Sequence, residues 1–163
     1  MMAMTDKKVL VTDDNAALRG LLRVSLQAFG FAKVIEATDG ERALETLRAE
    51  PVDLLITDWK MQPMDGVELV RALRDRVSSP APYLPIIILT AYADAGKANL
   101  ARDAGADQFL VKPFTAEALA RSITTVLDPQ RSFISDSNYF GPDRRRATAA
   151  SQDGTDRRLV AQH

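Results

Sequence analysis

The sequence predicts an α/β fold in which a doubly wound, five-stranded parallel sheet is covered by helices on both faces. Five short apolar segments of strand length alternate with segments whose apolar residues recur at helical spacing. The chain has 163 residues and is 46% hydrophobic, which is enough to fill one sizeable core. Strands and helices that alternate in so short a chain form parallel sheets with right-handed crossovers, and these place helices on both faces.

The predicted strands are rich in valine, isoleucine and leucine, as buried parallel strands should be. The last predicted helix begins after Thr115, which suits a helix N-cap. The five strands are Lys8 to Thr12, Lys33 to Ala37, Val52 to Thr57, Pro85 to Thr90 and Gln108 to Val111. The helices between and after them carry Leu18, Leu21, Leu22 and Leu26; Ala43, Leu44 and Leu47; Val67, Leu69, Val70 and Leu73; Ala98, Leu100, Ala101 and Ala104; and Leu119, Ile123, Val126 and Leu127.

The composition excludes several classes of protein. The absence of cysteine rules out disulfides, thiolate zinc sites and cysteine nucleophiles. No apolar run approaches the roughly 20 residues that span a bilayer, and the first residues, MMAMTDKK, lack the apolar stretch of a secretory signal. We therefore expect a soluble, cytoplasmic protein without membrane contact. We also expect a monomer. The single histidine is the last residue, so we expect no enzyme with turnover on an external substrate.

Polar residues follow the predicted strands where a doubly wound sheet places its ligand site, beyond the carboxyl ends of the strands. Asp13 and Asp14 follow the first strand, Asp58 the third, Thr90 ends the fourth and Lys112 follows the fifth. Each residue alone has an ordinary structural explanation, such as a turn or a cap. The complete set at successive strand ends favours a functional site.

Three carboxylates at one edge repel each other unless a divalent cation joins them, and oxygen ligands suit Mg²⁺. We expect Mg²⁺ to be held by Asp14, Asp58 and the backbone carbonyl of Lys60, with Asp13 acting through water.

A carboxylate can attack phosphorus when cations neutralise the phosphoryl oxygens. We assign Asp58 as the nucleophile and phosphoacceptor. Lys112 would pair with one phosphoryl oxygen and Thr90 would donate a hydrogen bond to another.

The segments VLVTDDNAALRGLL, LLITDWKMQPMDGVEL, PIIILTAY and GADQFLVKPF resemble the CheY-like receiver domains of response regulators over residues 5–127. The resemblance implies a flavodoxin-like (βα)5 fold and phosphorylation of Asp58 by a histidine kinase or phosphotransfer protein. It also implies a cis Lys112-Pro113 bond and a switch role for Phe109, whose rotamer would follow Thr90. The sequence departs from the family's pattern in two ways. Pro63 lies one residue later than is usual after the nucleophile. Lys60 adds a positive charge near the site, which could pair with phosphate or compete with Mg²⁺, or the side chain could simply face solvent.

Residues 128–163 form an extension with a different charge balance. Residues 1–130 carry a net charge of -3, whereas residues 131–163 carry +2, with arginine as their only cation other than the terminal histidine. The sequence GPDRRR, which begins at Gly141, is echoed by GTDRR, which begins at Gly154. With few apolar residues, we expect this tail to be disordered unless a ligand is bound.

An aspartate beside arginines suits guanine, because arginine can bond O6 and N7 while the carboxylate accepts from N1 and N2. A repeated motif suits a ligand with two guanines, and cyclic di-GMP has this composition. The segment SFISDSNYFGPDRRR resembles the arginine-rich extension of the Cle group of CheY-like proteins, which implies binding of cyclic di-GMP as an intercalated dimer. The candidate contact residues are Tyr139, Asp143, Arg144, Arg145, Arg146, Asp156, Arg157 and Arg158.

The same resemblance implies docking at the flagellar motor switch and effects on motility and surface attachment. Two alternatives stay open. The protein could be an ordinary phosphorylation-dependent shuttle with an inert tail. The arginines could instead bind nucleic acid, although the paired aspartates disfavour plain phosphate binding.

Overall fold

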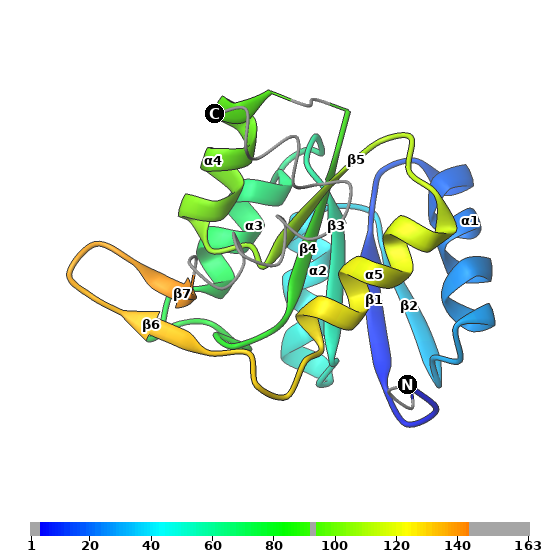
Figure 1. Cartoon of the computed structure of the whole chain (residues 1–163), viewed down its shortest axis with the longest axis horizontal. Helices are drawn as coiled ribbons and strands as arrows, with labels where there is room; N and C mark the ends of the chain where they lie inside the picture. The colour runs from blue at the N-terminus through cyan, green and yellow to red at the C-terminus, as the bar shows by residue number, and fades with distance from the viewer. Residues whose placement is uncertain (1–3, 92–93, 144–163) are drawn as a thin grey trace.

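The computed structural model describes residues 4–91 and 94–143. Five parallel strands form one sheet in the order β2-β1-β3-β4-β5, and the five repeats of strand and helix confirm the predicted doubly wound α/β fold (Figure 1). The strands are β1 (Lys8–Thr12), β2 (Lys33–Ala37), β3 (Leu54–Asp58), β4 (Ile86–Thr90) and β5 (Gln108–Val111). The helices are α1 (Ala16–Ala28), α2 (Gly40–Ala49), α3 (Gly66–Leu73), α4 (Ala95–Ala104) and α5 (Ala116–Val126).

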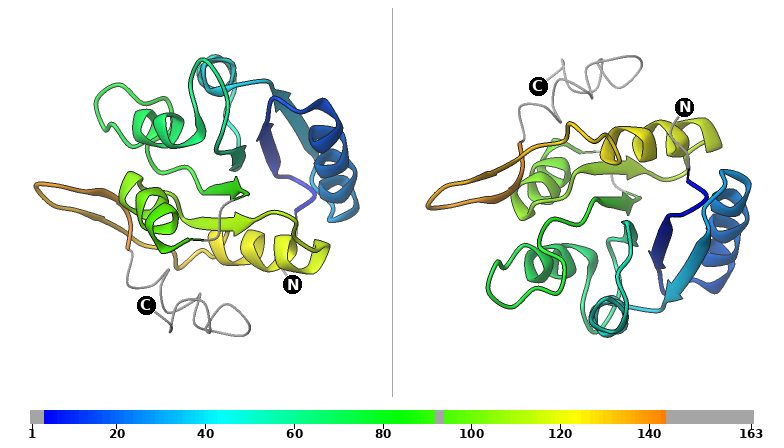
Figure 2. Two further views of the ribbon diagram at one scale, coloured as in Figure 1. Left: turned by 90° about the horizontal axis from the view of Figure 1, so that it is seen from above. Right: turned by 90° about the horizontal axis from the view of Figure 1, so that it is seen from below.

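The helices cover the sheet in two layers, with α1 and α5 on one face and α2, α3 and α4 on the other (Figure 2). Alternate residues of each strand face opposite layers. Ile87 and Leu89 of β4 pack toward α1 and α5, whereas Ile86 and Ile88 pack toward α2, α3 and α4, and all four are fully buried. This two-sided burial explains why the central strands have few polar residues before their carboxyl ends.

Every helix of the sheet layers begins at a side-chain cap, which fixes the end of the preceding loop. Thr115 caps α5 as predicted, since its hydroxyl oxygen accepts from the amide of Ala118 at 3.0 Å. Asp65 caps α3 in a reciprocal capping box with Glu68. The remaining caps are Asn15, Asp39 and Asp94.

The first part of the extension is folded, which corrects the expectation of a tail disordered without ligand. Residues Phe133–Ser135 (β6) and Phe140–Pro142 (β7) pair antiparallel, with Ile134 opposite Gly141. The amide of Asp143 donates to the carbonyl of Ser132 at 2.9 Å and continues the pairing. Residues 144–163 lie outside the described part of the chain.

The β6–β7 hairpin lies at the amino-end edge of the sheet. Arg131, just before β6, pairs with Asp107, which directly precedes β5 and also accepts from the amide of Ile86 at the start of β4. Figures 1 and 2 show the hairpin projecting from the molecule beside α3 and α4. Within the described residues, no helix combines the length and hydropathy needed to cross a membrane.

Candidate functional site

The five residues predicted from the strand ends meet at the carboxyl-end edge of the sheet. Asp58 is the last residue of β3 and Thr90 the last of β4, while Asp13 and Asp14 follow β1 and Lys112 follows β5. Oxygen atoms of the three carboxylates all lie within 4.8 Å of one another. The order β1-β3-β4-β5 in the sheet brings these ends side by side.

Lys112 and Asp58 form the central ion pair of the site. The Lys112 Nζ atom lies 2.8 Å from Asp58 Oδ1, and the Asp58 residue is only 7% exposed. The backbone amide of Lys112 donates to the carbonyl of Thr90 at 2.7 Å, and Thr90 is buried. The hydroxyl-bearing residue and the cation are therefore joined through the backbone at the ends of β4 and β5.

Asp13 is electrostatically the most perturbed carboxylate of the cluster. Burial raises its pKa from 3.8 to about 6, and the charge of Asp58 acts in the same direction. The hydrogen bond that Asn15 donates from its amide to Asp13 Oδ1, at 2.8 Å, and the charge of Lys112 both lower this pKa and oppose the rise. In the metal-free protein, the site thus carries more negative charge than its own cation compensates.

The donor set fits a hard divalent cation. Asp13 Oδ2 is buried and has no hydrogen-bond partner within the described residues, although it faces a cluster that contains two other carboxylates. An unpartnered carboxylate oxygen in such a position costs free energy that a bound cation would recover. Asp14 is exposed, which leaves one side of the cluster open to water ligands.

Gly66, at the start of α3, positions the nucleophile and was not identified from the sequence. A Cβ atom at this position would lie 2.2 Å from the carbonyl oxygen of Asp58, and the Gly66 amide donates to the carbonyl of Trp59 at 2.7 Å. The first turn of α3 therefore rests directly on the backbone of the nucleophile. An Asp-Gly pair shortly after a strand end is the only signal that the sequence offered.

A second unpredicted contact links α4 to the same segment. The Lys97 Nζ atom lies 5.3 Å from the centroid of the Trp59 ring, within the range of a cation–π interaction, and Trp59 is buried. Lys60 is exposed, and Phe109 is half-buried on β5 against the core. The predicted cis bond between Lys112 and Pro113 is confirmed, and the bond between Gln62 and the displaced Pro63 is also cis.

Only two of the predicted ligand contacts in the tail, Tyr139 and Asp143, lie in the described part of the chain. Tyr139, a predicted contact of the ligand, is 8% exposed and donates from its hydroxyl to the carbonyl of Pro142 at 2.9 Å. In this arrangement the Tyr139 ring packs within the protein, and its contact with a ligand stays a prediction. Asp143 is half-buried at the end of the hairpin. The other candidates, Arg144, Arg145, Arg146, Asp156, Arg157 and Arg158, lie outside the described residues.

Comparisons with known proteins identify the family of the chain. The model of the response regulator receiver domain family matches residues 9–124. The chemotaxis protein CheY of Pseudomonas aeruginosa is 36% identical over 121 residues, which cover 74% of this chain and 96% of the relative. CheY-3 of Vibrio cholerae is 32% identical over 121 residues, which cover 74% of this chain and 92% of the relative.

Solved structures of receiver proteins share the fold of this chain. The chemotaxis response regulator CheY4 of Vibrio cholerae superposes with a TM-score of 0.68 at 34% identity, covering 78% of this chain and 100% of that one. The receiver domain of the sensor histidine kinase PA1611 of Pseudomonas aeruginosa, described with a magnesium ion in its active site cleft, has a TM-score of 0.66 at 26% identity. That match covers 74% of this chain and 97% of the receiver domain.

Proposed function

Because the chain belongs to the response regulator receiver family, we propose that it acts as a response regulator that takes a phosphoryl group on Asp58. The observation that carries the proposal is the contact of 2.8 Å between Lys112 Nζ and Asp58 Oδ1, beside two further carboxylates. A buried carboxylate with an adjacent ammonium group and a cation-binding acidic cluster is suited to phosphoryl transfer.

In the proposed reaction, a carboxylate oxygen of Asp58 attacks the phosphorus of a phosphohistidine on a histidine kinase or phosphotransfer protein. The O–P bond forms as the N–P bond breaks, and the imidazole nitrogen keeps the electron pair and takes a proton from solvent. Lys112 moves from the carboxylate to a phosphoryl oxygen, and the Thr90 hydroxyl donates to another.

Mg²⁺ held by Asp14, Asp58 and the Lys60 carbonyl, with Asp13 through water, would supply positive charge against the phosphoryl oxygens. The switch role of Phe109 belongs to the same proposal: its half-buried ring on β5 would change position when Thr90 engages the phosphoryl group.

The phosphoacceptor is tested with acetyl phosphate and Mg²⁺, by intact mass and by sensitivity of the product to mild base, which cleaves acyl phosphates. Wild type should gain one phosphoryl group and Asp58→Asn none. The exposed control Asp6→Asn should behave as wild type. Undiminished incorporation by Asp58→Asn would refute the assignment.

We further propose that the arginine-rich tail binds cyclic di-GMP and thereby changes docking on a partner, which we take to be the flagellar motor switch. The repeated Gly-x-Asp-Arg-Arg sequence supports the ligand, because each copy combines the guanidinium donors and carboxylate acceptor that match guanine. The chemotaxis role in the names of the CheY relatives supports the partner.

Calorimetric titration of cyclic di-GMP into the intact chain tests the ligand. Micromolar binding that is lost in the double variant Arg144→Ala, Arg157→Ala but kept in Arg121→Ala, on the exposed face of α5, is the expected result. Binding to polynucleotides that weakens steeply with salt, without preference for the dinucleotide, would favour the nucleic-acid alternative.

Partner docking is tested in cells by swimming and surface attachment. Deleting residues 128–163 should alter both if the tail controls output. Normal behaviour after this deletion, together with a loss in Asp58→Asn, would identify an ordinary shuttle with an inert tail.

A further inference from the structure

Arg131 connects the extension to the receiver domain through a buried charge network. Its guanidinium group donates to both carboxylate oxygens of Asp107, with Nη2 3.0 Å from Oδ1, and to the carbonyls of Tyr83 at 3.0 Å and Leu84 at 3.3 Å. Its side chain is only 15% exposed. A planar guanidinium that makes several bonds in one orientation fixes the chain much more firmly than a surface ion pair would.

The receiver domain supplies a prepared acceptor for Arg131. Asp107 is 5% exposed and also accepts from Arg74 Nη2 at 3.0 Å and from the amide of Ile86 at 2.9 Å. Arg74 is equally buried and donates further to the carbonyls of Gly105 and Pro82, each at 2.9 Å. The Asp107 carboxylate is therefore shared by one guanidinium from the domain and one from the extension.

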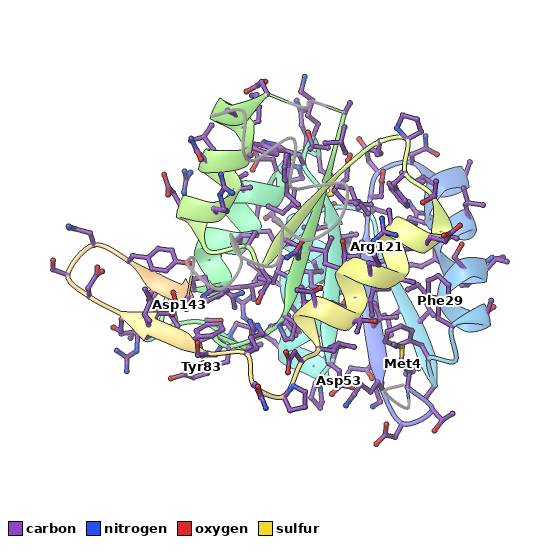
Figure 3. All side chains as sticks on the ribbon, viewed as in Figure 1. Met4, Phe29, Asp53, Tyr83, Arg121 and Asp143 are labelled. Atoms are coloured by element: carbon purple, nitrogen blue, oxygen red, sulfur yellow. The ribbon has the colours of Figure 1, made fainter. Side chains whose placement is uncertain are left out.

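Aromatic packing adds a second attachment. Tyr83, in the loop before β4, lies 5.1 Å from Phe133 and 5.4 Å from Phe140 between ring centroids. The guanidinium groups of Arg131 and Arg74 lie 4.4 and 4.9 Å from the centroid of Phe133. Figure 3 shows Tyr83 beside the hairpin. These contacts join both hairpin strands to the same edge of the domain.

The glycine of the first motif copy has a packing role. A Cβ atom on Gly141 would lie 2.6 Å from the Tyr139 hydroxyl and 3.3 Å from the Cα atom of Gly105. Tyr139 is buried beside it. The hairpin therefore packs against the domain through Tyr139, Phe140 and Gly141. The second motif copy, which begins at Gly154, has no aromatic residue directly before it.

We infer that the docked hairpin positions Asp143, the carboxylate of the first motif copy, for its ligand, with Arg131 as the fastening residue and Tyr139 as a packing residue. The inference rests on the proposed dinucleotide binding. The hairpin pairing extends to the amide of Asp143. The carboxylate that would bind guanine is therefore attached to a backbone that the hairpin holds in place. A fixed backbone lowers the ordering cost of binding, and Arg131 and Tyr83 would therefore affect affinity without touching the ligand.

The test uses the intact chain and its variants Arg131→Gln, Tyr83→Ala and their combination, with Arg121→Gln as a control of equal charge change on α5 (Figure 3). Amide hydrogen exchange over residues 133–142 reports docking, and calorimetry with cyclic di-GMP reports affinity. Arg131→Gln should accelerate exchange and weaken binding about tenfold. Arg121→Gln should change neither quantity.

The combined variant separates positioning from direct contact. If both residues act by docking the hairpin, the affinity lost in each variant should follow the protection from exchange that it loses, and the combined variant should lose the most of both. Affinity that is unchanged in Arg131→Gln despite fast exchange, or that falls without faster exchange, would overturn the inference while leaving cyclic di-GMP binding intact. An absence of binding by wild type would instead overturn the proposed ligand, and the inference with it.

Discussion

Asp13 shows how burial and function conflict at a single residue. The residue is 1% exposed and its carboxyl group lies beside two other carboxylates, so burial and, to a lesser extent, the charge of Asp58 raise its pKa to about 6. The folded protein holds this proton more tightly than the unfolded chain does. The free energy of unfolding should therefore fall as pH rises from about 4 to 6, and the penalty is fully present above about pH 6.

In metal-free protein, Asp13→Asn should remove this penalty. We expect the variant to be more stable than wild type at pH 7.5 by about 1–3 kcal/mol, with a difference that shrinks toward pH 4. Urea unfolding at a series of pH values in the presence of a chelator measures it. The exposed Asp6→Asn should follow wild type, and a stability difference for Asp13→Asn that is constant across this range would contradict the explanation.

Gly66 gives a second test at the scale of one residue. Alanine at this position would place its Cβ against the backbone of Asp58, so we expect a loss of about 2–4 kcal/mol and a lower phosphorylation rate. Gly20→Ala in α1 is the matched control, because its Cβ would meet nothing nearer than 3.9 Å. It should be neutral or stabilising by up to about 1 kcal/mol in thermal unfolding. Equal effects of the two substitutions would refute the steric argument.

At the scale of the elements, apolar patterning predicted the sheet well. The predicted bounds of β1, β2 and β5 are those of the structure, and the predicted third strand, Val52 to Thr57, is shifted to Leu54–Asp58. The difference arises because Asp53 does not lie in the strand, since its carboxylate accepts from the amide of Lys8 at 2.8 Å and ties the loop to β1. Such a contact between residues distant in sequence leaves no local pattern.

The hairpin was missed for a similar reason. Its strands have three residues each and lie in a polar segment, so neither periodicity nor composition distinguishes them from a loose tail. What holds them is distant in sequence: Tyr83 and Asp107 belong to the receiver domain. The pocket residues, in contrast, were predictable because parallel strands in a doubly wound sheet bring their carboxyl ends together.

Two truncations measure what the hairpin contributes. Ending the chain after Asp128 should lower the free energy of unfolding by about 2–3 kcal/mol, because Asp107 would keep Arg74 but lose Arg131 and the aromatic contacts. Ending it after Asp143 removes none of these contacts and should leave the stability unchanged. Equal stability of the two truncated chains, measured by urea unfolding, would show that the hairpin contributes nothing.

At the scale of the whole molecule, the two candidate sites occupy opposite edges of one sheet. Asp58 ends β3 at the carboxyl edge, whereas Asp107, which holds the hairpin, precedes β5 at the amino edge. β4 connects the two regions, since Ile86 at its start bonds to Asp107 and Thr90 at its end belongs to the pocket. Sites so placed are expected to contribute independently to stability unless the sheet itself moves.

This independence predicts the response to Mg²⁺. Addition of the ion should raise the melting temperature of wild type, because only the folded state gathers the carboxylates. The chain that ends after Asp128 should show the same rise, whereas Asp14→Asn should show a much smaller one. Differential scanning calorimetry with and without the ion checks this, and loss of the Mg²⁺ effect on truncation would reveal coupling between the two edges.

The close approach of Gly105 and Gly141 also limits where this extension could be transplanted. Gly105 ends α4 in a left-handed conformation with φ of 114°, and a Cβ there would lie 2.6 Å from the Arg74 side chain, so the receiving surface has no room for a larger residue. A protein engineer who fused residues 129–163 to another receiver would have to carry over Arg74, Tyr83, Gly105 and Asp107 as well. The hairpin would therefore not fold in the same way on an arbitrary receiver domain, because that domain must already have the surface against which the hairpin packs.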